Sequence, residues 1–281
     1  MDKLGGLVEI VRPVNSVMLG LAIIVGAAVT GGASILGSPP TLLLSFVTGF
    51  CMTGAAMAIN DYYDREIDAV NEPGRPIPSG RVTPVEAVAL TAALSVVGLG
   101  ASYMISLNAM LVAAISWVVM MLYSAWGKRT GFPGNLMVSA CISLPFIFGG
   151  LITGSMYPSL YFSLMAFLSN TGREVTKGIV DVEGDRGAGV NTVAVSKGPR
   201  TASVVASAFY VAAAASSLVP YALRLVSAWY LPFVAVTDLG LLYSAYSLIM
   251  EPTREKSRAV KNRVLYLMLV GLVGFAAGSL L

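Results

Sequence analysis

The stretch from Thr41 to Asp68 reads TLLLSFVTGFCMTGAAMAIN followed by DYYDREID, an apolar run that ends abruptly in acidic residues. The run from Thr41 to Asn60 carries no charged side chain, and about twenty apolar residues suffice for a helix to cross the hydrocarbon core of a bilayer. Carboxylates are costly beside hydrocarbon unless another charge compensates them. The stretch therefore predicts a membrane-spanning helix with an acidic cluster at one end, and this cluster requires a partner of opposite charge.

Composition extends this interpretation to the whole chain. Of the 281 residues, 56% are hydrophobic and 12% are charged, which is typical of a polytopic membrane protein. The first apolar run is followed by a second, so we expect it to be a transmembrane helix and not a removed leader. Cys51 and Cys141 lie inside apolar runs, where we expect small core residues and neither a disulfide nor a metal site.

Nine apolar stretches are long enough to cross a bilayer, so we predict an all-α fold, a polytopic membrane helix bundle of nine transmembrane helices in a single domain, 1–281. If the amino terminus is cytoplasmic, seventeen of the eighteen Lys and Arg residues lie in cytoplasmic connections, and only Arg224 lies outside. Miscounting one helix would scatter them over both faces. The predicted spans are 14–31, 41–60, 85–105, 108–127, 134–154, 158–174, 201–222, 229–250 and 263–281.

The first acidic cluster has a helical spacing. Asn60, Asp64 and Asp68 follow one another at intervals of four, which on a continuing helix places all three on one face near the cytoplasmic boundary. Oxygen ligands in such a stripe suit Mg²⁺, which takes one or two protein carboxylates and completes its shell with water and phosphate oxygens. This spacing favours a metal and a phosphorylated substrate as the compensating partners.

A second acidic cluster falls on the same predicted face of the membrane. Asp181 and Asp185 again stand four apart, and Glu174 and Lys177 precede them at helical steps in a stripe that carries both signs. The echo indicates either a duplicated helical unit or a chance repeat. Two facing stripes could hold a diphosphate between them through bridging metals.

Basic residues close to both clusters could neutralise the remaining phosphate charge. The nearest are Arg65, Lys177 and the adjacent pair Lys128 and Arg129. The alternative is that all these charges are solvated helix ends, but two clusters of matched spacing on one face favour a site.

These motifs resemble those of the UbiA-type intramembrane prenyltransferase family, over nearly the whole chain. The resemblance implies nine helices around a central cavity, with a prenyl diphosphate bound through Mg²⁺ to both aspartate motifs and transfer of the prenyl group to an acceptor. It implies that Asp64, Asp68, Asp181 and Asp185 are catalytic and that, with Asn60, they are the metal ligands; Asp61 and Glu183 have less certain roles. The matching motifs are Asn60-xxx-Asp64-xxx-Asp68, Asn71-Glu72-Pro73-Gly74-Arg75-Pro76, Asp181-xxx-Asp185, Arg12-Pro13-x-Asn15 and Tyr123 to Arg129.

Within the family, the stretch from Gly172 to Thr192 is most similar to the digeranylgeranylglyceryl phosphate synthase branch, from which it departs at Gly178, where an acidic residue is common. That resemblance implies geranylgeranyl diphosphate as donor, and as acceptor geranylgeranylglyceryl phosphate, a precursor of archaeal ether lipids. The alternative is an aromatic acceptor such as 4-hydroxybenzoate. Expected contacts to the acceptor phosphate, each of which could instead be a topology anchor, are Arg75, Arg81, Lys128, Arg129 and Arg173.

Three further features remain open. Asp238 falls near the middle of the eighth predicted span, where it either lines the cavity or bonds to groups such as Tyr243 or Ser244. Asn15 either reaches the diphosphate or caps the first helix. The last cytoplasmic loop, 254–263, carries five basic residues and is expected to lie on anionic head groups.

Other functional classes fit less well. A divalent-cation transporter would carry its carboxylates near mid-membrane, whereas these lie at one face among cations. Phosphatidyl-alcohol transferases use a closely spaced Asp-x-x-Asp-Gly run, which the chain lacks. A purely structural lipid-binding bundle has no need of two matched metal motifs.

Overall fold

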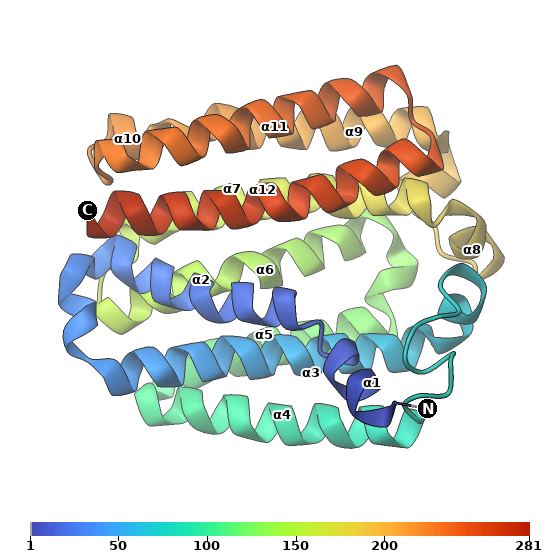
Figure 1. Cartoon of the computed structure of the whole chain (residues 1–281), viewed down its shortest axis with the longest axis horizontal. Coiled ribbons are helices and arrows are strands. Elements are labelled where there is room, and N and C mark those ends of the chain that lie inside the picture. The colour runs from blue at the N-terminus through green and yellow to red at the C-terminus, as the bar shows by residue number, and fades with distance from the viewer. Residues whose placement is uncertain (1) are drawn as a thin grey trace.

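The computed structural model describes residues 2–281, with the exception of the Asn71 side chain, so that position of the motif lies outside the described residues. Long helices run side by side in alternating directions to form one bundle (Figure 1). Short helices join them: α1 (Lys3–Ile10), η1 (Gly32–Gly37), η2 (Gly127–Thr130), α8 (Val182–Gly187), α10 (Val219–Ala222) and η3 (Ala228–Tyr230). The long helices are α2 (Pro13–Gly31), α3 (Pro39–Asn71), α4 (Pro84–Ile105), α5 (Leu107–Ala125), α6 (Phe132–Thr153), α7 (Tyr157–Val180), α9 (Val193–Ser217), α11 (Leu231–Met250) and α12 (Arg254–Leu280).

The predicted all-α membrane bundle is confirmed, with one qualification about the number of spans. Within residues 2–281, eight helices are long and apolar enough to cross a membrane, and α7 is the long helix that does not meet this standard. Its buried positions include Asn170, Glu174 and Thr176, because it packs against α2, α6, α9 and α12 instead of facing lipid. A helix enclosed by other helices can carry polar groups that a lipid-facing helix cannot.

Two helices extend beyond their predicted spans at the same end of the bundle. The 33 residues of α3 cover about 50 Å at 1.5 Å per residue, against about 30 Å of hydrocarbon, so its last turns project beyond the membrane. The segment 254–263 is the start of α12, capped by Thr253, and not a loop as we predicted. Long basic side chains can extend to the interface from such a helix end, which makes an unwound loop unnecessary.

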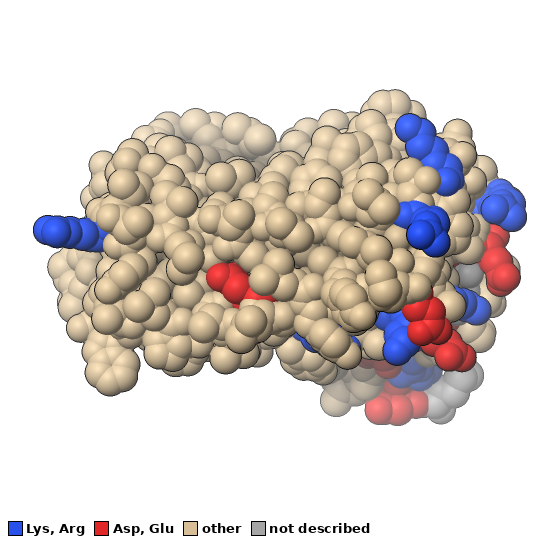
Figure 2. All heavy atoms as spheres, turned by 90° about the horizontal axis from the view of Figure 1, so that it is seen from above, with Lys and Arg blue, Asp and Glu red and all other residues tan. Residues whose placement is uncertain are grey.

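Charge gathers at this end of the bundle, which we call the charged end. Figure 2 shows most acidic and basic groups together there, with one basic group at the opposite end. The connections after α1, α3, α5, α7 and α11 meet at the charged end, and Arg224 lies between α10 and η3 at the other end. The predicted distribution of basic residues is therefore reproduced by the fold.

Small residues bring α2 very close to its neighbours on both sides. A Cβ atom added to Gly49 of α3 would lie 2.7 Å from the Gly20 Cα of α2. On the other side, a Cβ atom added to Gly26 would lie 2.8 Å from the Phe146 backbone of α6. Such close approach is typical of helix pairs in membranes. Helix α2 is therefore packed tightly between α3 and α6, and it lines both of the apolar cavities described in the next section.

Candidate active site at the charged end

The first aspartate motif lies on one face of α3, as its spacing predicts. The Asn60 Nδ2 donates a 3.0 Å hydrogen bond to Asp64 Oδ2, and both side chains are buried. The Lys128 Nζ in η2 lies 2.7 Å from the same Asp64 oxygen. Because η2 follows shortly after α5, the end of α5 positions the Lys128 ammonium beside the first motif.

Two arginines neutralise the other two aspartates of α3. Arg75, in the loop after α3, lies 2.5 Å from Asp68 Oδ2 and 3.5 Å from Asp61 Oδ1. Arg12 contacts the same Asp61 oxygen at 2.6 Å. Asp61 is therefore an anchor that ties the start of α2 and the α3–α4 loop to α3, a role that its place beside the motif did not reveal.

Arg12 holds an unusual backbone conformation to make this contact. Its φ of 47° and ψ of 72° lie in the left-handed region, which residues with a side chain seldom adopt and which costs about 1–3 kcal/mol. Pro13 follows immediately and starts α2. The guanidinium also donates a 3.1 Å hydrogen bond to the Met57 sulfur, so two contacts to α3 offset this cost.

The second motif is built differently, because α7 ends before it. Asp181 is the C-terminal cap of α7, with φ −99° and ψ 10°, and Asp185 lies in the following short helix α8. The predicted stripe from Glu174 to Asp185 is thus interrupted at Asp181. Glycines at 184, 187 and 189 are in keeping with the short length of α8, since glycine disfavours a continued helix.

The charge of the second motif is not compensated by ion pairs. Among the described residues, neither Asp181 nor Asp185 has a basic partner within 4.0 Å. Burial raises the pKa of the Asp185 carboxyl to about 6, and the charge of Lys128 opposes the shift only in part. A further cation would be favoured here.

The two motifs nonetheless share one small polar pocket between α3, α7 and α8. Lys177 lies beside them, and an adjoining open cavity includes Arg129 and Glu183. The lining of the shared pocket is Asp64, Ile67, Asp68, Glu72, Arg75, Lys128, Lys177, Asp181 and Asp185.

The donor set suits Mg²⁺, although the residues are not arranged as a closed cage. In the described part of the chain, no three His, Cys, Asp or Glu side chains are close enough to hold a metal by themselves. Magnesium does not require this, since it is usually held by one or two carboxylates together with water and phosphate oxygens. Carboxylates of both motifs on one pocket, with Asp185 short of cations, fit that pattern.

Some predicted residues lie away from this pocket. Arg65 stacks on Tyr62 and pairs with Glu66 on its own helix, and Arg81 pairs with Glu9. Neither lines the shared pocket. Arg173 pairs with Glu174 at 3.2 Å, deeper along α7. The alternative that Asn15 caps α2 is wrong, because the cap position is Arg12.

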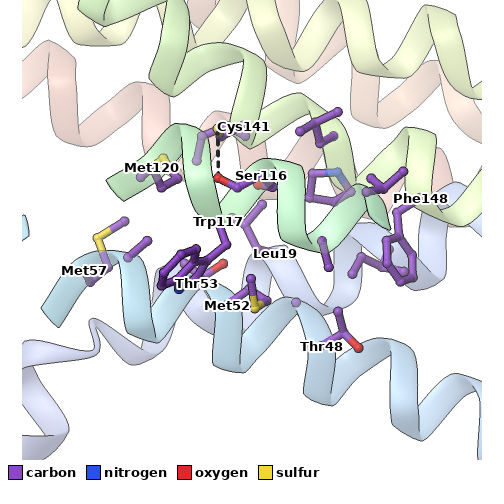
Figure 3. A pocket seen from close by; sticks show the side chains of 18 of the residues that line it. Leu19, Thr48, Met52, Thr53, Met57, Ser116, Trp117, Met120, Cys141 and Phe148 are labelled. Atoms are coloured by element: carbon purple, nitrogen blue, oxygen red, sulfur yellow. Dashed lines mark hydrogen bonds between the residues drawn. The ribbon is translucent and has the colours of Figure 1, made fainter. Parts of the chain in front are cut away.

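An apolar cavity lies inside the bundle, and the part of α3 that precedes the first motif forms one of its walls. It lies between α2, α3, α5 and α6; we call it the α5 cavity. Figure 3 shows Met57, Met120 and Trp117 among the side chains that line it. The Trp117 indole is fixed by a 2.8 Å hydrogen bond to Ser95 of α4.

A second apolar cavity lies on the other side of α2. It is bounded by α2, α6, α7, α9, α11 and α12; we call it the α11 cavity. Asp238 lines it, as one of the two alternatives expected. The Ser217 Oγ donates a 2.6 Å hydrogen bond to the Asp238 carboxylate, so the hydrogen-bond partners predicted in the other alternative, Tyr243 and Ser244, are wrong. The single cavity expected from the family resemblance is thus divided, with Leu19 and Ile142 in the wall of both parts.

Comparisons with known proteins agree with this geometry. The chain is 36% identical to a digeranylgeranylglyceryl phosphate synthase of Methanothermobacter thermautotrophicus, over 97% of this chain and 95% of that protein. A solved structure of a digeranylgeranylglyceryl phosphate synthase is similar at a TM-score of 0.77, with 30% identity and 99% of each chain covered. A UbiA homologue from Archaeoglobus fulgidus, solved with DMAPP and Mg²⁺, has a TM-score of 0.64 at 15% identity, over 96% of this chain and 99% of that one.

The family model points the same way. The model of the UbiA prenyltransferase family matches residues 18–273, which include both aspartate motifs and all nine long helices in whole or in part. With these matches and a multi-pass membrane fold, the chain belongs to the UbiA prenyltransferase family.

Proposed function

We propose that the protein transfers the geranylgeranyl group of geranylgeranyl diphosphate to the free hydroxyl of geranylgeranylglyceryl phosphate and releases diphosphate, in a reaction that depends on Mg²⁺. The observation that carries this proposal is the pocket where two aspartate motifs and three cations meet, beside helix α3, which also lines an apolar cavity. The relatives named as synthases of this product, similar over nearly the full length, support the choice of substrates.

Binding of the donor diphosphate would divide between the two motifs. Asn60, Asp64, Asp68, Asp181 and Asp185 would hold Mg²⁺, in keeping with the Mg²⁺ and DMAPP of the Archaeoglobus homologue. When bound, Mg²⁺ links the diphosphate to the carboxylates and stabilises the charge on the leaving group.

The cations of the pocket would act directly on the diphosphate. Lys128 and Arg75 now contact Asp64 and Asp68, and they can move to phosphate oxygens once metal compensates these carboxylates. Lys177 lines the same pocket from the α7 side. These three residues would stabilise the negative charge that develops on the diphosphate as the bond between carbon and oxygen breaks.

The transfer itself needs an apolar approach to the first prenyl carbon. That carbon gains positive character as the diphosphate leaves with the bonding electron pair, the glycerol hydroxyl oxygen attacks it, and the hydroxyl proton passes to a diphosphate oxygen. The apolar wall near Met57 and Met120 would keep water away from this carbon and so prevent hydrolysis. No separate general base is required by this route.

A competition assay tests the proposal. The purified protein in nanodiscs receives Mg²⁺, geranylgeranyl diphosphate, geranylgeranylglyceryl phosphate and 4-hydroxybenzoate, and products are identified by mass. A diether phosphate is the expected product. Prenylated benzoate would keep the reaction type and overturn the acceptor, and the absence of diphosphate release would overturn the function.

We further propose that the charged end faces the cytoplasm, since basic connections favour that side. The test uses a membrane-impermeant thiol reagent on intact cells. In Arg224→Cys the new thiol should be labelled from outside, whereas in Lys197→Cys it should be labelled only after permeabilisation. The native Cys51 and Cys141 are buried and give little background. The reverse labelling pattern would contradict the orientation.

A further inference from the structure

The two apolar cavities continue from different groups at the charged end. On α3, Ala56 and Thr53 of the α5 cavity lie four and seven positions before Asn60, on the same helical face. On α5, Met120 and Met121 line this cavity just before the chain reaches Lys128. The α5 cavity therefore leads away from the first aspartate motif.

The α11 cavity continues from a different set of side chains. On α7, Ser169 and Ala166 lie four and seven positions before Arg173, again on one face. On α12, Met268 lies seven positions after Lys261. Two separate helices, α7 and α12, thus each carry a cation between the charged end and the residues that line the α11 cavity.

These cations belong to a cluster with an excess of positive charge. The buried carboxylate of Glu174 lies in the field of Lys177, Arg173, Arg12 and Lys261. Among the described residues, only Arg173 and Lys177 form ion pairs with it, at 3.2 and 3.9 Å. In the described residues Lys261 forms no ion pair, although it is partly buried. Lys177 and Arg173 are near enough to repel its ammonium, and Asp181 and Glu72 are near enough to attract it.

One atom of this cluster also lacks a partner. The Arg173 Nε is buried and has no hydrogen-bond acceptor among the described residues. A buried donor without an acceptor is costly, and several like charges gathered in a partly buried place are costly too. An anion bound between Arg173 and Lys261 would remove both costs.

We propose that Arg173 and Lys261 bind the phosphate of the acceptor, that the α11 cavity holds the acceptor's prenyl chain, and that the α5 cavity holds the donor's chain. This assignment rests on the proposed function. The acceptor carries a phosphate, an apolar chain and a free hydroxyl on one glycerol. With its phosphate and chain on the α7 and α12 side, its hydroxyl faces the donor held at the first aspartate motif on the other side of α2.

The phosphate contact is tested with Lys261→Ala and with Lys256→Ala as the matched control, since Lys256 is exposed on the same helix. In Lys261→Ala, the KM for geranylgeranylglyceryl phosphate should rise about tenfold or more, as expected for a lost charged hydrogen bond, and Lys261→Arg should restore most of it. The KM for the donor should stay within about twofold of the wild type.

An acceptor without phosphate separates binding from a general structural effect. With geranylgeranylglycerol, Lys261→Ala and the wild type should have the same kcat/KM, since there is no phosphate to lose. An equal loss with both acceptors, or a rise in the donor KM instead, would overturn the phosphate site. If the wild type forms no diether at all, the proposed function itself is overturned, whereas normal wild-type activity with an unaffected variant overturns this assignment alone.

The two cavities are tested by narrowing each in turn. Ala166→Phe should raise the KM for an acceptor with a twenty-carbon chain and leave a ten-carbon acceptor unaffected. Ser116→Phe in the α5 cavity should instead raise the KM for geranylgeranyl diphosphate and leave the KM for geranyl diphosphate unaffected. The opposite pattern would reverse the assignment. Melting curves of the purified variants confirm folding, and Ala166→Leu and Ser116→Leu serve if the larger side chain is not accepted.

Discussion

The two aspartate motifs have the same spacing and opposite states of charge compensation. The first lies on the continuous helix α3, where Lys128 and Arg75 already pair with Asp64 and Asp68. The second lies where α7 has ended, and in the described residues it has no ion-pair partner. From this difference we expect the motifs to have different tasks, with metal affinity depending mainly on the second motif and phosphate affinity on the cations of the first.

The largest effect is expected from removing one carboxylate of each motif. Asp64→Ala and Asp181→Ala should each lower kcat by about 10²- to 10³-fold or more, because each removes charge stabilisation of the leaving diphosphate. The measurement is product formation at saturating Mg²⁺ with protein shown to be folded. Glu66→Gln is the control, since this carboxylate is 86% exposed and two residues from Asp64. Near-normal turnover in either alanine variant would refute a site that bridges both motifs.

The next effect distinguishes the motifs directly. Lys128→Ala should raise the KM for geranylgeranyl diphosphate by about tenfold or more, because a charged contact to phosphate is lost. It should not raise the Mg²⁺ concentration needed for half-maximal activity, since removal of a positive charge makes the pocket more attractive to metal. Asp181→Asn should instead raise the Mg²⁺ concentration needed for half-maximal activity and have the smaller effect on the KM for geranylgeranyl diphosphate. If both variants shift the Mg²⁺ requirement equally, the division of tasks is wrong.

Metal binding should also be visible as stability. At ten times its dissociation constant, Mg²⁺ should stabilise the folded protein by about 1.4 kcal/mol, and EDTA should remove this gain. Thermal unfolding in detergent, with Ca²⁺-free buffers, measures the shift. Asp185→Asn should abolish it and Lys128→Ala should retain it. A shift that survives in Asp185→Asn would place the metal away from the second motif.

The smallest effect is expected at Arg65. Its guanidinium stacks on Tyr62 and contacts Glu66, outside the shared pocket, so Arg65→Ala should change kcat/KM for the donor by no more than about threefold. We predicted a substrate contact from its position beside Asp64 in the sequence. A loss of tenfold or more in steady-state kinetics would mean that the side chain turns toward the diphosphate after all.

Much of this architecture could be predicted because lipid imposes a simple rule on sequence. The lengths of the apolar runs predicted the long helices, and the positions of the basic residues predicted which connections lie at the same end of the bundle. Charged helix ends were harder to predict, because a polar segment such as 254–263 can be helical without being apolar. The same limit hid the break at Asp181, where a four-residue spacing is equally compatible with a continued helix and with a cap followed by a short turn.

The site was predictable in its motifs and not in its pairings. The spacing of Asn60, Asp64 and Asp68 defines a face, which the 3.0 Å contact between Asn60 and Asp64 reflects. Which cation meets which carboxylate depends on loops, as with Arg75, and on the strained backbone of Arg12. The role of Lys261 had no local signal, because its neighbours Arg173 and Lys177 are distant in the chain.

The polarity of α7 has a consequence for biosynthesis. Helices enter the membrane in order as the chain is made, and a segment with Arg173 and Glu174 near its end is not apolar enough to partition by itself. We expect α7 to enter only in company with neighbours such as α6 and α9, which cover its polar face. The helix that completes the shared polar pocket would thus be retained in the bilayer by the rest of the protein and not by lipid.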